Sequence, residues 1–183
     1  LSDELSKKLC ISKPVARLLS SRGVNTVEAA EKFLSPDKSD FINPFELYGM
    51  SAAVERINKA ISLNESVLIY GDYDCDGLAA ISILYTFLKD KIDKVSYYVP
   101  NRHSDGYGLH DIVVEDLTKN EGIDLVITVD CGITSKNEVK CIKEMGIDVV
   151  VTDHHEPIPE LIPDGIVLNP KVDRKSFSDY CGA

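Results

Sequence analysis

The chain has 183 residues, of which 44% are hydrophobic and 27% charged, and it contains no tryptophan. These proportions are typical of a globular protein with an apolar core, and they exclude wholesale disorder or a collagen-like fibre. The formal net charge of −10 argues against broad, unassisted binding to nucleic-acid phosphates.

The negative charge is confined to the later part of the chain. Residues 1–60 carry nine Lys and Arg against eight Asp and Glu, whereas residues 61–183 carry eleven against twenty-two. Either this later part repels anions, or some of its carboxylates hold cations that reverse the local charge.

Neither a membrane segment nor a disulfide framework is predicted. No apolar run approaches the roughly 20 residues that a membrane helix needs, and the first ten residues lack the apolar region of a secretory signal. The five cysteines are odd in number, include no CxxC pair and match no zinc module. We therefore expect reduced thiols in a cytoplasmic protein.

Residues 1–50 are predicted to form a small helical region. Ser12 and Pro14 are typical of a helix start, and Gly23 of its end. Asn25 or Thr26 is expected to cap a second short helix.

From Ser51 the pattern predicts a longer helix and then a sheet, because Val54, Ile57 and Ile61 recur at helical spacing. Short runs that are apolar on consecutive residues then predict strands buried on both faces, at 66–71, 95–99, 125–129, 148–152 and, more weakly, 165–168. Helical segments are expected between them, at 78–89, 111–119 and 135–145, the last opening with a capping box from Ser135 to Glu138. This alternation predicts an α/β fold over residues 51–183, a mostly parallel sheet with helices on both faces.

Three of the predicted strands end in a carboxylate. Asp72 follows Gly71, Asp130 follows Val129 and Asp153 follows Thr152, each at the end of a predicted strand. Open parallel sheets bind their ligands at this edge, although a single Asp there more often caps a helix. Three such endings, each beside further polar residues, predict a functional site.

The first of these clusters is the segment 71–77, GDYDCDG. Its alternate carboxylates suit a hard cation that takes oxygen ligands. An EF-hand loop is excluded because its twelfth position is Ile83 and a strand precedes it, and a phosphate-binding glycine loop is excluded because neither GxxxxGK[ST] nor GxGxxG is present.

The other two clusters add a carboxylate and two imidazoles. Asp130 precedes Cys131 and Gly132, which alone is more typical of a structural turn, and Asp153 precedes His154 and His155. Imidazole is a frequent ligand of Mn and Zn. Taken together, the clusters predict two divalent ions, Mn²⁺ or Mg²⁺, bridged by a shared carboxylate.

A further polar segment, residues 100–110, follows the second strand. Arg102 could hold a phosphate in a bidentate contact, and Tyr107 could stack on a base. The alternative is a glycine-rich turn before the helix near Asp111.

The motifs GDYDCDG, VDCG and DHH, in this order and each after a strand, resemble the signature of the DHH phosphoesterase superfamily. The stretches SSRGV, AEKFLSP, NPFEL, AVERINKAI and PNRHSDGYGLH are similar to those of its bacterial branch of exonucleases specific for single-stranded DNA. The resemblance covers nearly the whole chain. It implies 5′-to-3′ hydrolysis of single-stranded DNA by two Mn²⁺ ions in DNA repair and recombination, with single-strand-binding protein and a helicase as possible partners and no membrane.

The resemblance also assigns roles to individual residues. The implied metal ligands are Asp74, Asp76, Asp130 and His154, whereas Asp72 matches a motif position outside that set. The implied catalytic residues are His155, near the scissile phosphate, and Asp153, which orients the histidines. Arg102 is implied to hold the terminal phosphate of the substrate.

One departure concerns the end of the chain. The family has a further metal-ligating Asp and additional domains beyond residue 183, so we expect an N-terminal fragment with little or no activity alone. Three alternatives remain: a DHH phosphoesterase acting on short oligonucleotides, cyclic dinucleotides or pyrophosphate; a non-catalytic replication scaffold; and a phospho-accepting receiver domain. A receiver domain requires a Lys after one of its late strands. Lys171 meets this requirement poorly, because it directly follows Pro170.

Overall fold

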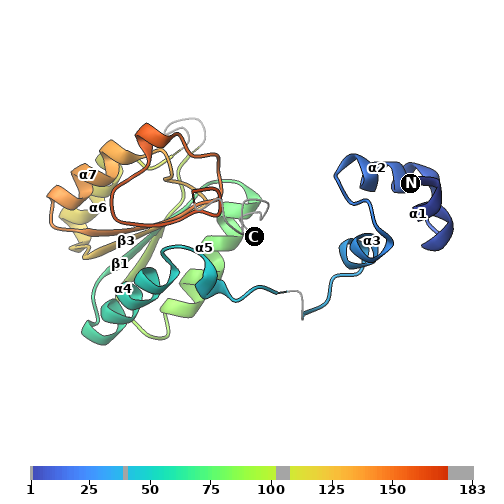
Figure 1. Ribbon diagram of the computed structural model, residues 1–183. Coiled ribbons are helices and arrows are strands. Elements are labelled where there is room, and N and C mark those ends of the chain that lie inside the picture. The colour runs from blue at the N-terminus through green and yellow to red at the C-terminus, as the bar shows by residue number, and fades with distance from the viewer. Residues whose placement is uncertain (1, 39–40, 102–107, 173–183) are drawn as a thin grey trace. The chain divides into compact units, whose positions relative to one another are not determined.

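The structure, a computed structural model, describes residues 2–38, 41–101 and 108–172. The chain divides into two compact units, Leu1–Asn43 and Pro44–Ala183 (Figure 1). Arg102 and Tyr107 lie outside the described residues.

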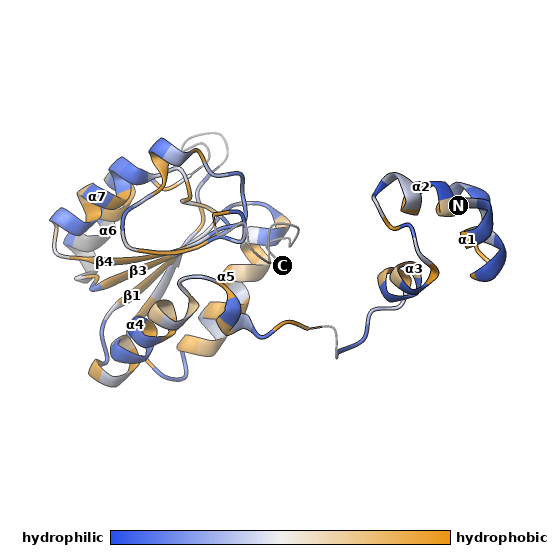
Figure 2. Ribbon diagram, viewed as in Figure 1, coloured by the Kyte–Doolittle hydropathy of each residue, from blue (hydrophilic) through white to orange (hydrophobic). Residues whose placement is uncertain are grey.

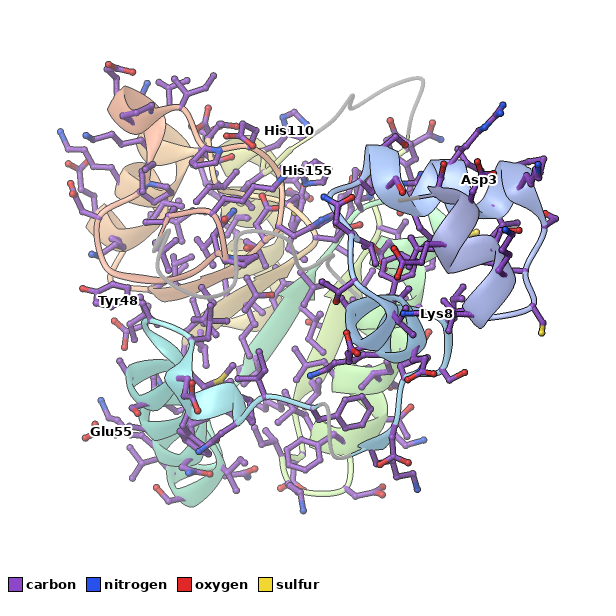
Figure 3. The ribbon with its side chains drawn as sticks, turned by 45° about the vertical axis from the view of Figure 1, so that its right-hand side comes forward. Asp3, Lys8, Tyr48, Glu55, His110 and His155 are labelled. Carbon is purple, nitrogen blue, oxygen red and sulfur yellow. The ribbon has the colours of Figure 1, made fainter. Side chains whose placement is uncertain are left out.

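The first unit contains three short helices: α1 (Ser2–Lys8), α2 (Lys13–Ser21) and α3 (Val27–Leu34). Its small core is formed by Leu5, Ala16, Leu19 and Ala30. The predicted cap of α3 is confirmed, because Thr26 Oγ1 accepts a hydrogen bond from the backbone N–H of Ala29 at 3.1 Å. Asp3 and Lys8, labelled in Figure 3, show the acidic start and basic end of α1, which complement the helix dipole.

The second unit is a parallel α/β domain. Its helical elements are η2 (Pro44–Glu46), α4 (Met50–Leu63), α5 (Cys75–Leu88), α6 (Asp111–Glu121), α7 (Lys136–Glu144) and η3 (Pro159–Leu161). Its strands are β1 (Val67–Tyr70), β2 (Val95–Tyr98), β3 (Leu125–Val129), β4 (Asp148–Thr152) and β5 (Ile166–Leu168). All pairings are parallel, in the order β2-β1-β3-β4-β5, so the predicted fold class is confirmed.

Helices cover both faces of the sheet (Figure 1). On one face α4 and α5 pack with residues such as Ile69, Ile127 and Val150, and on the other α6 and α7 enclose a core that includes Leu68 and Val126. Every residue of β1 and β3 is buried, which explains why these strands are apolar on consecutive positions.

Two local expectations need correction. The helix predicted from residue 78 begins at Cys75, because Asp74 caps it. Ser135 stands at the N-cap of α7, but its backbone is not extended and its side chain makes no capping hydrogen bond. The N–H of Ser135, which the Glu138 side chain would accept in a capping box, donates to Gly132 O at 3.0 Å. The predicted capping box is therefore wrong.

The described cysteines, at 10, 75, 131 and 141, are free thiols. None of the helices in the described ranges has the length and apolar character required to cross a membrane.

Candidate metal centre

The carboxyl ends of β1, β3 and β4 form the candidate metal centre. These three strands are neighbours in the sheet, and Asp72, Asp130 and Asp153 follow them closely. Parallel strands present their carboxyl ends at one edge. Residues that are distant in sequence therefore meet there, as the sequence predicts.

The loop after β1 places two of its carboxylates by backbone hydrogen bonds. Asp74 Oδ1 accepts from the N–H groups of Asp76 at 2.9 Å and Gly77 at 3.0 Å, and these bonds, Gly77's foremost, hold the Asp74 pKa below its usual value. Asp72 is buried, and its Oδ1 accepts from the N–H of Tyr73. A Cβ at Gly77 would lie 2.6 Å from Asp72 O, so only glycine fits where the helix start crosses the loop.

Asp130 is the most constrained residue of the site. Its φ of 60° is in the left-handed region, which an Asp visits more readily than most residues. The residue is buried, and neither carboxylate oxygen has a hydrogen-bond partner. Burial, with the Asp74 carboxylate adding repulsion, raises the pKa of Asp130 to about 6. A buried carboxylate of this kind is stabilised by a cation.

Two threonines brace the turn that carries Asp130. The Thr128 hydroxyl, fully buried, donates to Cys131 O at 2.8 Å, and the Thr152 hydroxyl donates to Thr128 O at 2.6 Å. The N–H of Asp130 in turn donates to Thr152 O at 3.0 Å. These bonds tie the ends of β3 and β4 together around the left-handed residue. Sequence reasoning misses both threonines.

Asp153 organises the histidine pair. Its Oδ1 accepts from the N–H groups of His154 and His155 and lies 2.7 Å from His155 Nδ1, and its Oδ2 accepts from the N–H of Ile133 at 2.9 Å. The contact to Nδ1 therefore fixes the orientation of the His155 ring. His155 is labelled in Figure 3.

His154 lies close to carboxylates from two loops. Its Nε2 is 2.9 Å from Asp130 Oδ1, without forming a hydrogen bond to it, and 3.8 Å from Asp76 Oδ2. The rings of His154 and His155 stack loosely, with centroids 4.6 Å apart. Cys131 stays outside this set because burial raises the pKa of its thiol well above the usual value, and a protonated thiol is a poor ligand.

The described residues contain two groups whose potential ligand atoms lie within 4.8 Å of one another. One group is Asp130, His154 and His155, and the other is Asp72, Asp74 and Asp130. Asp130 belongs to both. Asp72, which the sequence leaves outside the ligand set, is therefore close enough to be a candidate ligand.

The family follows from a comparison with known proteins. A sequence profile described as "DHH family, N-terminal domain" matches residues 66–183. The chain therefore belongs to the DHH family.

Individual relatives within this family carry a particular name. The chain is 43% identical over 167 residues to the single-stranded-DNA-specific exonuclease RecJ of Bacillus subtilis, covering 91% of this chain and 21% of that protein. A solved structure of exonuclease RecJ bound to manganese has a TM-score of 0.64 and 35% identity, covering 70% of this chain and 33% of that chain. A structure of RecJ from Thermus thermophilus in complex with Mn²⁺ has a TM-score of 0.68 and 28% identity, covering 96% of this chain and 24% of that chain.

These relatives are several times longer than the chain. It spans about a fifth of the B. subtilis protein and a quarter to a third of the two solved chains.

Proposed function

We propose that the chain is the catalytic N-terminal part of a metal-dependent exonuclease that hydrolyses single-stranded DNA from the 5′ end, in DNA repair and recombination. One observation carries this proposal: side chains from three strand ends meet around Asp130, whose two buried oxygens have no hydrogen-bond partner. The names of the relatives, which are RecJ exonucleases, support the choice of substrate.

Divalent cations fit this donor set. Asp74, Asp76, Asp130 and His154 supply mixed carboxylate and imidazole ligands, which suit Mn²⁺ and, less well, Mg²⁺. We propose two ions with Asp130 as the shared carboxylate, because it alone belongs to both described groups, and we add Asp72 as a further candidate ligand. The two solved RecJ structures that hold Mn²⁺ support this cation.

The proposed chemistry is phosphodiester hydrolysis. Bound divalent ions lower the pKa of water and offset the negative charge of a phosphoryl group. In this chain Asp153 holds the His155 ring through Nδ1, and we propose that the ring so oriented lies near the scissile phosphate. Arg102 is proposed to hold the terminal phosphate and Tyr107 to stack on a base.

The charge of the protein is consistent with this function. The proposed site consists of carboxylates within a unit that carries thirteen Lys and Arg against twenty-four Asp and Glu. Such a surface repels DNA unless cations occupy the site. DNA binding is therefore expected to depend on the metal.

The test uses the complete protein with Mn²⁺ and 5′-phosphorylated single-stranded DNA. We expect mononucleotide release, no release from His154→Ala or Asp130→Asn, and unchanged release from Asp90→Asn, an exposed control on a loop remote in sequence from the site. Near-normal turnover by either site variant would refute the assignment. The 183-residue chain by itself is expected to show little or no activity, since it covers only a fraction of its relatives.

The same assay separates the alternatives. A DHH phosphoesterase of small substrates would prefer dinucleotides, cyclic dinucleotides or pyrophosphate to long DNA, and a replication scaffold would hydrolyse none of them. Single-strand-binding protein and a helicase stay predicted partners, and the cytoplasmic location stays a prediction.

A further inference from the structure

Asn169, which lies directly after β5, is a buried polar residue that the proposed chemistry does not use. The residue is 2% exposed. Its Nδ2 donates a hydrogen bond to the backbone oxygen of His155 at 3.0 Å, and its Oδ1 accepts one from the backbone N–H of Lys171 at 2.8 Å. A buried amide therefore links the end of β5 to a histidine of the candidate metal centre.

The two partners of this amide determine both its orientation and its residue type. A backbone N–H can only donate and a backbone carbonyl can only accept, so Oδ1 must face Lys171 and Nδ2 must face His155. Asparagine offers this donor and acceptor together, whereas a leucine of similar size offers neither and a carboxylate offers no donor. The neighbouring strand β4 is apolar and buried over residues 149–151, and Figure 2 draws it mostly in orange tones. An unpaired polar group beside it would be costly.

The loop that carries the histidine pair is held by hydrogen bonds more than by packing. The side chain of His155 is 41% exposed, so its neighbours restrain it only on one side. Strands β4 and β5 stay joined up to Asp153, whose N–H donates to Leu168 O at 3.0 Å. Beyond that point the Asp153 carboxylate accepts from the N–H of His155 and contacts its ring, and Asn169 donates to its C=O. The main chain of His155 is therefore anchored on both sides of its Cα.

We propose that Asn169 is a positioning residue for His155, because it fixes the main chain of the histidine and so keeps the ring in place at the metal centre. This inference rests on the proposed function, since Asn169 acts on the hydrolysis only through His155. A misplacement of about 1 Å can cost an enzyme about 100-fold in rate. Loss of the amide should therefore lower kcat, whereas KM should change less, since a buried amide offers the substrate no contact.

The first test measures hydrolysis of 5′-phosphorylated single-stranded DNA by the complete protein with Mn²⁺. Asn169→Asp keeps the size of the side chain and the acceptor for the N–H of Lys171, and it removes the donor to His155. Asn169→Ala removes both. We expect kcat to fall about tenfold or more in each variant, with KM within about twofold of the wild type.

Asn64→Ala is the matched control, because Asn64 makes the same two kinds of side-chain hydrogen bond. Its Nδ2 donates to Asp93 Oδ2 at 2.8 Å, and its Oδ1 accepts from the N–H of Asp93 at 3.0 Å. Asn64 lies between α4 and the start of β1, at the opposite end of that strand from the metal centre. We expect its kcat to stay within about twofold of the wild type.

Two kinetic results would overturn the proposal. One is a kcat of Asn169→Asp within about twofold of the wild type, and the other is an equal loss of kcat in Asn64→Ala, which would attribute the effect to lost stability.

A second test does not depend on the DNA substrate. Crystal structures of the complete wild-type protein and of Asn169→Asp are compared, and we expect the Cα of His155 to move by about 0.5 Å or more while Asp130 stays in place. An unmoved His155, or an equal movement of Asp130, would overturn the positioning role. A wild type that does not hydrolyse single-stranded DNA would contradict the proposed function instead, and the structural comparison would still decide whether Asn169 positions His155.

Discussion

Replacing Asp130 by Asn should stabilise the metal-free protein while abolishing its response to metal. The carboxylate is buried without hydrogen-bond partners, and its pKa is raised from 3.8 to about 6. This shift corresponds to about 3 kcal/mol against the ionised folded state at pH 8. Because an amide at this position also has unpaired polar atoms, we expect a net gain of about 1–2 kcal/mol.

The gain has a defined pH dependence. A carboxyl whose folded pKa is raised destabilises the protein fully above that pKa, and the penalty disappears below the unfolded value of 3.8. Between pH 8 and pH 5 the penalty falls from about 3 to about 1.6 kcal/mol, so the net stabilisation by Asp130→Asn should fall by about 1.4 kcal/mol, to nearly zero.

Urea denaturation with a chelator measures both effects. At pH 8 the urea midpoint of Asp130→Asn should exceed that of the wild type, and a separate thermal scan should show a Tm higher by about 2–8 °C. Added Mn²⁺ should then stabilise the wild type and the Asp90→Asn control but not the variant. A variant that is less stable without metal and equally stabilised by Mn²⁺ would refute the reasoning.

Three further predictions concern the same site. Protons compete with metal at Asp130, so calorimetric Mn²⁺ affinity should fall about tenfold per pH unit below about pH 6, and an affinity that is flat down to pH 5 would exclude Asp130 as a ligand. Thr128→Val removes the hydroxyl that braces the Asp130 turn and should lower Mn²⁺ affinity about tenfold, whereas Thr128→Ser, which keeps the hydroxyl, should restore it; equal loss in both would point to packing alone. Asp153→Asn disturbs the contact to His155 Nδ1 and should reduce kcat by about tenfold or more with a smaller change in KM, measured on single-stranded DNA; an unchanged kcat would show that this contact does not position the ring.

Much of the fold could be predicted because its causes are local. Strands that are buried on both faces, such as β1 and β3, must be apolar on consecutive positions, and this pattern is visible in the sequence. The parallel arrangement then requires strand-end residues to share one edge. Asp74, Asp130 and His154 could therefore be assigned to one site from the sequence alone.

The unpredicted features depend on geometry that only the folded chain defines. Helix α1 has seven residues and buries Leu5 alone, so it has no apolar periodicity to detect. The left-handed backbone of Asp130 and its unpartnered oxygens depend on the register that pairs Val129 with Thr152. Thr128 is likewise an ordinary strand residue until that register places it beneath the turn.

Crystals of the protein soaked in Mn²⁺ and measured for anomalous scattering test the central proposal most directly. We predict two peaks at the carboxyl ends of β1, β3 and β4, both within coordination distance of Asp130, with His154 on one and Asp74 on the other. Peaks elsewhere, or an edge without bound ions at saturating Mn²⁺, would contradict the proposed centre.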